Sequence, residues 1–283
     1  GLALTRYQIN GAIDNTFNKQ FYSDTTFYTT SIITTANDKI ITSGYWQSSS
    51  GNNIFISRFN SDGTKDNTFG INGKTLINLG KVSIFNTYLS INSDASLSLI
   101  VEYRDQDQYE INFKSIKLSS TGKLNVSLGN NGIVDIKTQN NFFMRHIYYK
   151  NNTVDKYGNI FFAGTSSNEN GVDQFSILKY TPQGFLDNSF GTNGKSIPIS
   201  EGNAHEGIIP IINNDGNNLI CGFELKNGRY SLAIGSIDSG GIPDLSFGSK
   251  SIYTVNIGLG KNINGIAQAI LTSNKGKVYV AGY

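Results

Sequence analysis

The fold is decided by a stretch that reads Ile56-Ser-Arg58-Phe59-Asn-Ser-Asp62-Gly63-Thr-Lys-Asp66-Asn-Thr68-Phe69-Gly70-Ile-Asn72-Gly73, because its central part recurs along the chain. The recurring pattern is Gly-x-x-Asp-x-Ser/Thr-Phe, and its third copy is degenerate, with Asn for Asp and Leu for Phe. The five copies begin at Gly11, Gly63, Gly122, Gly184 and Gly241, which gives steps of 52, 59, 62 and 57 residues. A fixed period of this length indicates a repeat architecture.

A second pattern keeps the same period and supports the repeat independently. It is an apolar strand that ends in a small residue followed by Gly, and the clear copies end at Gly44, Gly164, Gly222 and Gly282. The weak copy spans Leu97–Glu102, with Glu102 in the place of the glycine. Two markers with one period predict five repeats of about sixty residues each.

Each repeat is expected to form four short strands. An apolar stretch leads into an Asn/Asp/Gly turn such as Asn37-Asp38, and residues of this kind favour the tight turns of hairpins. No window shows sustained helical periodicity. Four strands repeated radially are typical of a β-propeller, which protects the edges of its sheets.

We therefore expect an all-β fold, a single domain over residues 1–283, with five blades of four antiparallel strands. From the motif spacing, the chain is expected to begin and end within a loop between the second and third strands of a repeat. The last blade is accordingly expected to take two strands from each terminus, and their pairing closes the ring.

Composition removes several classes of function. Lys and Arg number 23 against 21 Asp and Glu, so there is no large basic excess and nucleic acid is not an expected partner. One cysteine excludes a disulfide framework and a cysteine-rich zinc site. No apolar run approaches 18 residues, so no membrane span is expected. We expect no cofactor.

The combined motifs resemble the bacterial delta-sixty repeat family, and the best copy is the stretch Ile56–Gly73 quoted above. The resemblance covers all five repeats, although the third is poor and the fifth lacks Gly-x-Asn-Gly after Gly248. It implies a propeller-like module of a bacterial surface or secreted protein and assigns no reaction. Fold alone does not define function, so this context is an analogy.

The repeated motif residues are interpreted as structural. An Asx side chain two residues before Ser or Thr can cap its own turn, and the following aromatic residue is expected to fill the space between blades. The structural set is Asp14, Asp66, Asn125, Asp187 and Asp244, with Phe17, Phe69, Leu128, Phe190 and Phe247. The alternative is five carboxylate or Ca²⁺ sites. Four repeats carry a cation at the same strand position. We expect these cations to form ion pairs within a blade and not an anion site; they are Arg6, Arg58, Lys117 and Lys179.

Departures from the repeat are the candidate binding residues. His146 and His205, the two histidines of the chain, precede their strand glycines by 18 and 17 residues and are expected at the same rim of neighbouring blades. With Glu206 they could hold a metal ion, and with Arg145 and Tyr148 a glycan or a carboxylate. The alternative is a chance coincidence on solvated loops.

Known catalytic motifs are missing, so the chain is not expected to be an enzyme. The leading hypothesis is a non-enzymatic binding or scaffolding module of a bacterial protein that is secreted, attached to the cell surface or periplasmic. Its partner would be a protein or a glycan, and self-association or a larger assembly stays open. The alternatives are a lectin-like glycan-binding propeller and a glycoside-active enzyme.

Overall fold

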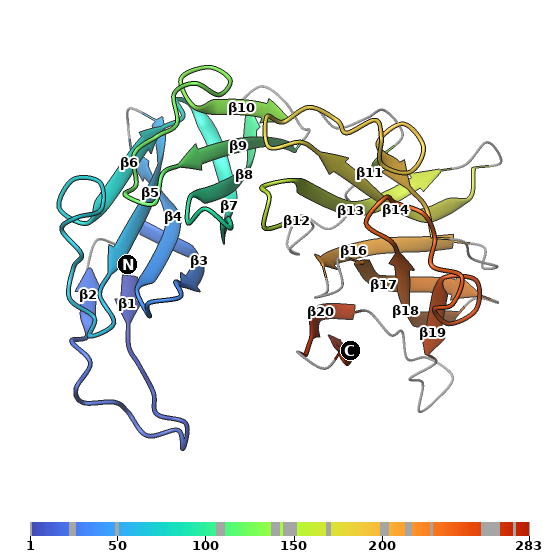
Figure 1. The fold of residues 1–283 in the computed structure, drawn as a ribbon, viewed down its shortest axis with the longest axis horizontal. Coiled ribbons are helices and arrows are strands. Elements are labelled where there is room, and N and C mark those ends of the chain that lie inside the picture. Colours follow the sequence, from blue (N-terminus) through green and yellow to red (C-terminus); the bar gives the residue numbers. More distant parts are fainter. Residues whose placement is uncertain are drawn as a thin grey trace. The chain divides into compact units, whose positions relative to one another are not determined.

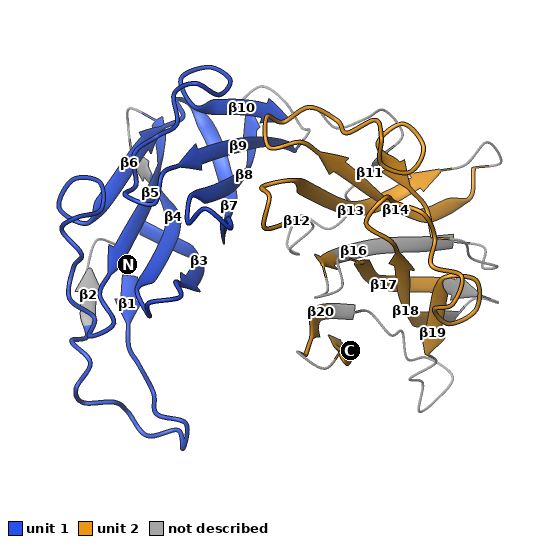
Figure 2. Ribbon diagram, viewed as in Figure 1, with its two compact units in different colours: residues 1–137 blue, residues 138–283 orange. Residues whose placement is uncertain are grey.

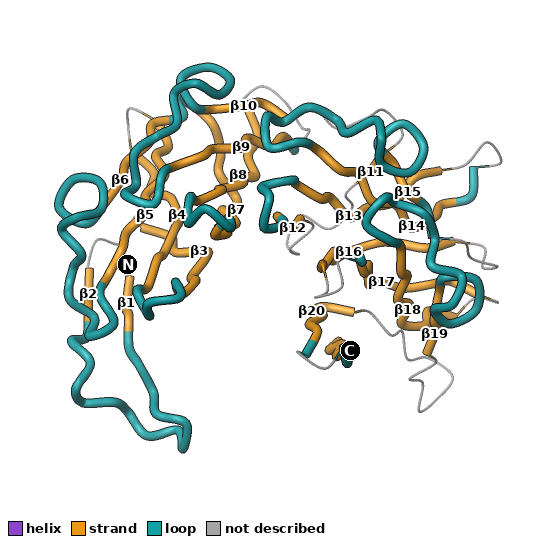
Figure 3. The backbone as a smooth tube through the Cα atoms, in the orientation of Figure 1, coloured by secondary structure: helices purple, strands orange, loops and turns teal. Residues whose placement is uncertain are grey.

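The structure is a computed structural model that describes residues 2–22, 27–48, 51–105, 111–136, 142–143, 152–167, 171–198, 204–212, 217–226, 229–255, 267–273 and 276–282. Every regular element in this part of the chain is a β-strand (Figure 3). The chain divides into two compact units, residues 1–137 and 138–283, which we describe separately (Figure 2).

Unit 1 contains two four-stranded antiparallel sheets, in which strands adjacent in sequence pair in order (Figure 1). The first sheet consists of β3 (Phe27–Thr34), β4 (Ile40–Ser48), β5 (Gly51–Phe59) and β6 (Lys74–Asn78). The second consists of β7 (Val82–Ile91), β8 (Leu97–Asp105), β9 (Asn112–Leu118) and β10 (Ile133–Ile136). A separate two-stranded sheet pairs β1 (Leu2–Leu4) with β2 (Gln20–Tyr22).

Unit 2 repeats the same meander. Its first sheet consists of β11 (Phe142–Phe143), β12 (Asn152–Val154), β13 (Ile160–Ser167), β14 (Asp173–Tyr180) and β15 (Lys195–Ser196), and both β11 and β12 pair with β13. The next consists of β16 (Ala204–Ile212), β17 (Asn218–Lys226), β18 (Arg229–Ile237) and β19 (Ile252–Val255). The last pairs β20 (Ala267–Thr272) with β21 (Val278–Gly282).

The predicted all-β class and the four-stranded antiparallel sheets are confirmed. The count of five blades is not established, because β1–β2 and β20–β21 are separate two-stranded sheets and the described strand pairings do not join them. The structure therefore contains several propeller-type sheets without a closed one.

The core of each unit lies between successive sheets. In unit 1, Ile41 and Ile54 of one sheet pack with Leu89 and Leu99 of the next. In unit 2, Phe161 packs in a cluster with residues of the following sheet. Apolar side chains that face a neighbouring sheet are buried from water, and this burial stabilises the packing of one sheet on the next.

A β-bulge between Thr29 and Ser31 brings the first strand of its sheet close to Gly44. A Cβ atom at Gly44 would lie 2.0 Å from the backbone oxygen of Tyr28, so only glycine fits at this position. In β8 the residue with the same register is Val101. The alignment of Glu102 with Gly44 is therefore wrong by one residue.

The substitution of valine for glycine has a structural consequence in the second sheet. The bulge of β7 lies between Ile84 and Asn86, two residues further from the hairpin turn than in β3. The Cβ atom of Val101 leaves no room for the closer approach, so the bulge faces Glu102 and Tyr103 instead.

Candidate functional site

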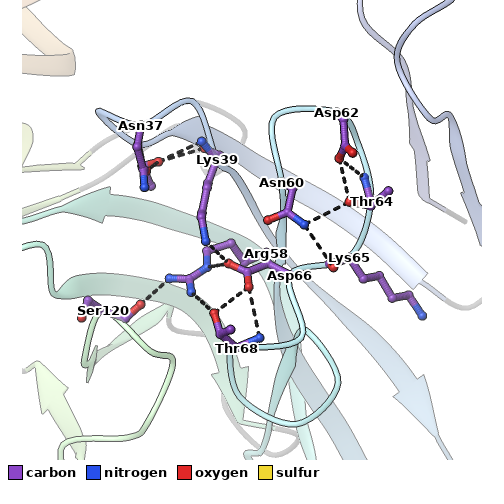
Figure 4. Close-up of polar contacts among 11 residues, drawn as sticks. Asn37, Lys39, Arg58, Asn60, Asp62, Thr64, Lys65, Asp66, Thr68 and Ser120 are labelled. Carbon is purple, nitrogen blue, oxygen red and sulfur yellow. Dashed lines mark hydrogen bonds and ion pairs between the residues drawn. The ribbon is translucent and has the colours of Figure 1, made fainter.

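The repeated turn is built around one carboxylate, which Figure 4 shows for Asp66. Asp66 Oδ1 accepts hydrogen bonds from the backbone N–H of Thr68 at 3.1 Å and from its hydroxyl at 2.6 Å, which forms an Asx turn. Asp66 Oδ2 accepts from Arg58 Nε at 2.7 Å and from Lys39 Nζ at 2.6 Å. Burial acts to raise the pKa of Asp66, but hydrogen bonds from Lys39, Thr68 and Arg58 outweigh it and hold that pKa far below its usual range.

The other copies share this arrangement. In each of them the acceptor side chain binds the backbone N–H and the hydroxyl of the residue two positions later, and the acceptors are Asp14, Asn125, Asp187 and Asp244. The strand cation lies 2.8 Å from the carboxylate in two of them, as Arg6–Asp14 and Lys179–Asp187. The sequence predicts these ion pairs within a repeat. A stabilising role for the motif stays a prediction.

Each turn also contacts the motif that follows it in the same unit. Phe69 is fully buried, and the Arg58 guanidinium lies over its ring at 4.7 Å. A Cβ atom at Gly122, which begins the next motif, would lie 2.7 Å from that ring, so the glycine makes room for it. Arg58 donates to the backbone oxygen of Ser120, and Gly70 N–H donates to that of Thr121 at 2.8 Å.

We call this set of contacts the turn latch: the Asx turn, its cation, the following aromatic ring and the bonds to the next motif. It recurs from Phe17 to Gly63 in unit 1 and from Phe190 to Gly241 in unit 2. Leu128 and Phe247, which end the third and fifth motifs, are only half-buried. The polar atoms of the Asp66 turn are occupied by protein partners, so this turn offers little to a ligand.

The predicted rim residues are only partly covered by the structure. Arg145, His146 and Tyr148 lie outside the described residues. The backbone of His205 and Glu206 lies in β16, opposite Glu224 and Phe223 of β17. A binding role for all five stays a prediction. In the described part of the chain, no three His, Cys, Asp or Glu side chains gather where they could hold a metal ion.

A buried acid lies next to the shifted bulge of the second sheet. Glu102 is 2% exposed, and its Oε2 accepts from the Tyr88 hydroxyl at 2.9 Å and from Asn86 Nδ2 at 3.2 Å. Burial raises the pKa of Glu102 to about 7, although both hydrogen bonds act in the opposite direction. The residues of matching register are Tyr45, Thr165 and Phe223, so this acid is peculiar to one repeat.

A pocket of about 710 Å³ lies in unit 2, at the hairpin ends of three successive sheets. Its apolar lining comes from Val154, Phe161, Ile211, Ile212, Ile270 and Leu271. Its polar lining comes from Thr153, Asp155, Lys156, Tyr157, Lys179, Asn218, Ser239 and Thr272. Its size is that of a pocket for a small organic ligand.

Asn218 is the unusual residue of this pocket. Its backbone pairs with Ile237 and Ile212. The equivalent positions of other repeats are occupied by Ile40, Leu97 and Ile160. Asn218 is 2% exposed, and its Nδ2 donates to the backbone oxygen of Asp238 at 3.2 Å. Its Oδ1 is buried and has no hydrogen-bond partner among the residues that the structure describes.

Motif analysis of the sequence missed this residue. The signal was an amide at a position that is aliphatic in the four other repeats, as Ile40, Leu97, Ile160 and Val278. The position can be found by counting, because Asn218 lies four residues before Gly222 just as Ile40 lies four residues before Gly44, and the two turns have the same length.

Comparisons with known proteins support the propeller class. Residues 35–69 and 158–190 match the family model described as "Domain of unknown function (DUF5122) beta-propeller". These segments contain the second and third strands and the Asp turn of two repeats. Two segments of the chain thus match a propeller-type repeat family. No curated protein matches the sequence.

One solved structure similar to this chain is the crystal structure of the polysaccharide lyase Uly1. The likeness covers 89% of this chain and 53% of the lyase chain, with 11% sequence identity and a TM-score of 0.47. This chain therefore spans about half the length of that protein.

The finding contradicts the prediction that the chain is not an enzyme. That neighbour is named as a polysaccharide lyase. Missing sequence motifs are an absence and do not exclude catalysis. At this identity the likeness gives this chain no substrate and no reaction.

In the described residues, no helix is long and apolar enough to cross a membrane.

Proposed function

We propose that this chain is a ligand-binding β-propeller module with its binding site at the hairpin ends of the sheets in unit 2. The observation that carries this proposal is the pocket of about 710 Å³ whose buried Asn218 departs from the repeat and keeps an unpartnered acceptor. Propellers hold their ligands on loops and strand ends of a rigid scaffold, and the turn latch supplies that rigidity here.

The proposal includes a ring of five blades, in which the two terminal half-sheets complete one blade. The strands β20 and β21 carry the bulge that marks the first two strands of a repeat, between Ala267 and Ala269 opposite Gly282 and Ala281. The strands β1 and β2 flank an Asp turn, at Asp14, which marks the third and fourth strands. The two halves are therefore different and complementary.

Burial in the half-sheets agrees with an incomplete blade. Tyr279 is 53% exposed, yet the residues of the same register, Ile41, Phe161 and Leu219, are at most 3% exposed. In unit 1 a hollow of about 670 Å³ lies between β1 and the face of β3 and β4. In a complete propeller, the first strands of a neighbouring blade occupy such a place.

We also propose that the module belongs to the delta-sixty type of repeat and acts in a secreted, surface-attached or periplasmic bacterial protein. The motif spacing and the match to a propeller-type family support this assignment. The ligand is a glycan or a protein.

The proposal is tested with the immobilised full chain, which is presented with an oligosaccharide array and, separately, with an array of synthetic peptides. Specific binding on either array, weakened by Asn218→Leu, supports a binding module with this site. Saturable binding that Asn218→Leu leaves unchanged contradicts the site, and two blank arrays contradict the binding function.

A further inference from the structure

We propose that the pocket of unit 2 binds a neutral saccharide, with Asn218 as the polar anchor and Tyr157 as the aromatic surface at its mouth. This inference rests on the proposed binding function and specifies its ligand class.

The buried amide requires a hydrogen-bond donor. An unpaired buried carbonyl oxygen costs on the order of 1–3 kcal/mol, so such a group is normally satisfied. In the repeats with Ile40, Leu97 and Ile160 the same position has no polar atom to satisfy. Asn218 Nδ2 already donates to the backbone of Asp238, and Oδ1 has no partner among the described residues, so a ligand hydroxyl would pair with Oδ1 once the side chain turns toward the pocket that it lines.

The walls of the pocket provide apolar surface at two depths. Phe161 is 3% exposed and Ile270 is 9% exposed, so they form part of the closed side. Tyr157 is 66% exposed at the turn between β12 and β13, and its ring is open to solvent. A pyranose fits this combination because it has an apolar C–H face for an aromatic ring and hydroxyl groups around its edge.

The charges near the pocket balance. Lys179 Nζ lies 2.8 Å from Asp187, so its charge is neutralised within the turn latch. Asp155 closes the turn of its own hairpin by accepting from the backbone of Tyr157 and Asn159 at 2.8 Å. Lys156 Nζ lies 5.1 Å from the centroid of the Tyr157 ring. The lining carries two lysines and one aspartate, and Lys179 is already paired with Asp187, so no strong excess of one charge attracts an anionic ligand, which favours a neutral saccharide.

The experiment is calorimetric titration of the full chain with neutral oligosaccharides of glucose, galactose, mannose and xylose, and with an oligogalacturonate as the acidic comparison. Asn218→Leu removes the acceptor and restores the aliphatic residue of the other repeats. Tyr157→Ala removes the exposed ring. Tyr253→Ala is the matched control, because Tyr253 is 54% exposed in the same unit and does not line the pocket.

We expect at least one neutral oligosaccharide to bind, and each pocket variant to weaken it by about tenfold, the effect of one lost hydrogen bond or stacking contact. Tyr253→Ala should leave the affinity unchanged. Asn218→Leu should unfold at the same temperature as the parent chain or higher, so lost binding would not reflect lost folding.

Three outcomes would overturn the inference. The first is that no neutral oligosaccharide binds, in which case Asn218 holds a water molecule and nothing more. The second is that a saccharide binds and neither pocket variant weakens it. The third is tighter binding of the oligogalacturonate than of every neutral probe. Peptide binding that Asn218→Leu weakens, without saccharide binding, would leave the proposed module standing and reject only its ligand class.

Discussion

At the scale of single residues, one motif position shows how environment decides the value of an ion pair. Asp66 lies between two cations with 4% of its side chain exposed, whereas Asp14 pairs with Arg6, whose side chain is 41% exposed. The motif is the same, but burial strengthens the interaction at Asp66 and water screens it at Asp14.

Asp66→Asn is therefore expected to destabilise the protein by on the order of 2–4 kcal/mol, because the amide keeps the turn and leaves Arg58 and Lys39 without an anion. Asp14→Asn, the matched control, should have a much smaller effect. Because the folded state lowers the pKa of Asp66, its stabilisation is present at neutral pH and is lost as the solution becomes acidic. Urea unfolding should show the gap between wild type and Asp66→Asn narrowing below pH about 4, and a constant gap would contradict this account.

Glu102 gives the opposite dependence on pH. Its pKa is raised to about 7 from an ordinary value of 4.5, so the folded state disfavours the charged carboxylate. The resulting destabilisation is absent below pH 4.5 and complete above pH 7. Glu102→Gln should therefore gain on the order of 2–3 kcal/mol over the parent chain between pH 4.5 and pH 8, measured by urea unfolding. Parallel pH profiles of the two proteins would show that Glu102 is not the titrating group.

At the scale of strands, the position of the bulge follows from one side chain. Gly44 of β4 has no side chain, so the bulge of β3 can lie directly opposite it. Val101 occupies the equivalent position of β8, and the bulge of β7 lies two residues further along the strand. The strands and their turns are predictable from the sequence because Asn, Asp and Gly mark the hairpins and the apolar residues mark the buried faces. The shifted bulge and the polar cluster at Glu102 are not predictable, because they depend on a register that the motif spacing leaves uncertain by one residue.

Gly44→Ala should destabilise the protein by at least about 2 kcal/mol, because its Cβ atom would overlap the backbone oxygen of Tyr28. Gly240→Ala is the control, since a Cβ atom there would meet only Asp238 Oδ1 at 3.4 Å. Guanidinium unfolding of both variants measures the difference. Equal stabilities would mean that β3 can move its bulge as β7 does.

At the scale of the whole molecule, the repeats predict the architecture well and the binding site poorly. The period of about sixty residues identifies four-stranded sheets because every repeat must form the same hairpins and the same turn. A ligand site needs to occur only once, so periodicity carries no information about it. The spacing of the strand glycines places the amide of Asn218 at an aliphatic position, but only the structure shows that this amide is buried and lines a pocket.

The central proposal, that the two terminal half-sheets complete a five-bladed ring, is tested most directly by the unfolding free energy of Tyr279→Ser. Tyr279 is 53% exposed on β21, and Tyr253 on β19, at 54%, is the matched control. A closed ring buries Tyr279 against the next blade, so we predict that Tyr279→Ser loses about 2–4 kcal/mol while Tyr253→Ser stays within about 0.5 kcal/mol of the parent chain. Equal and negligible losses in both variants would contradict closure of the ring.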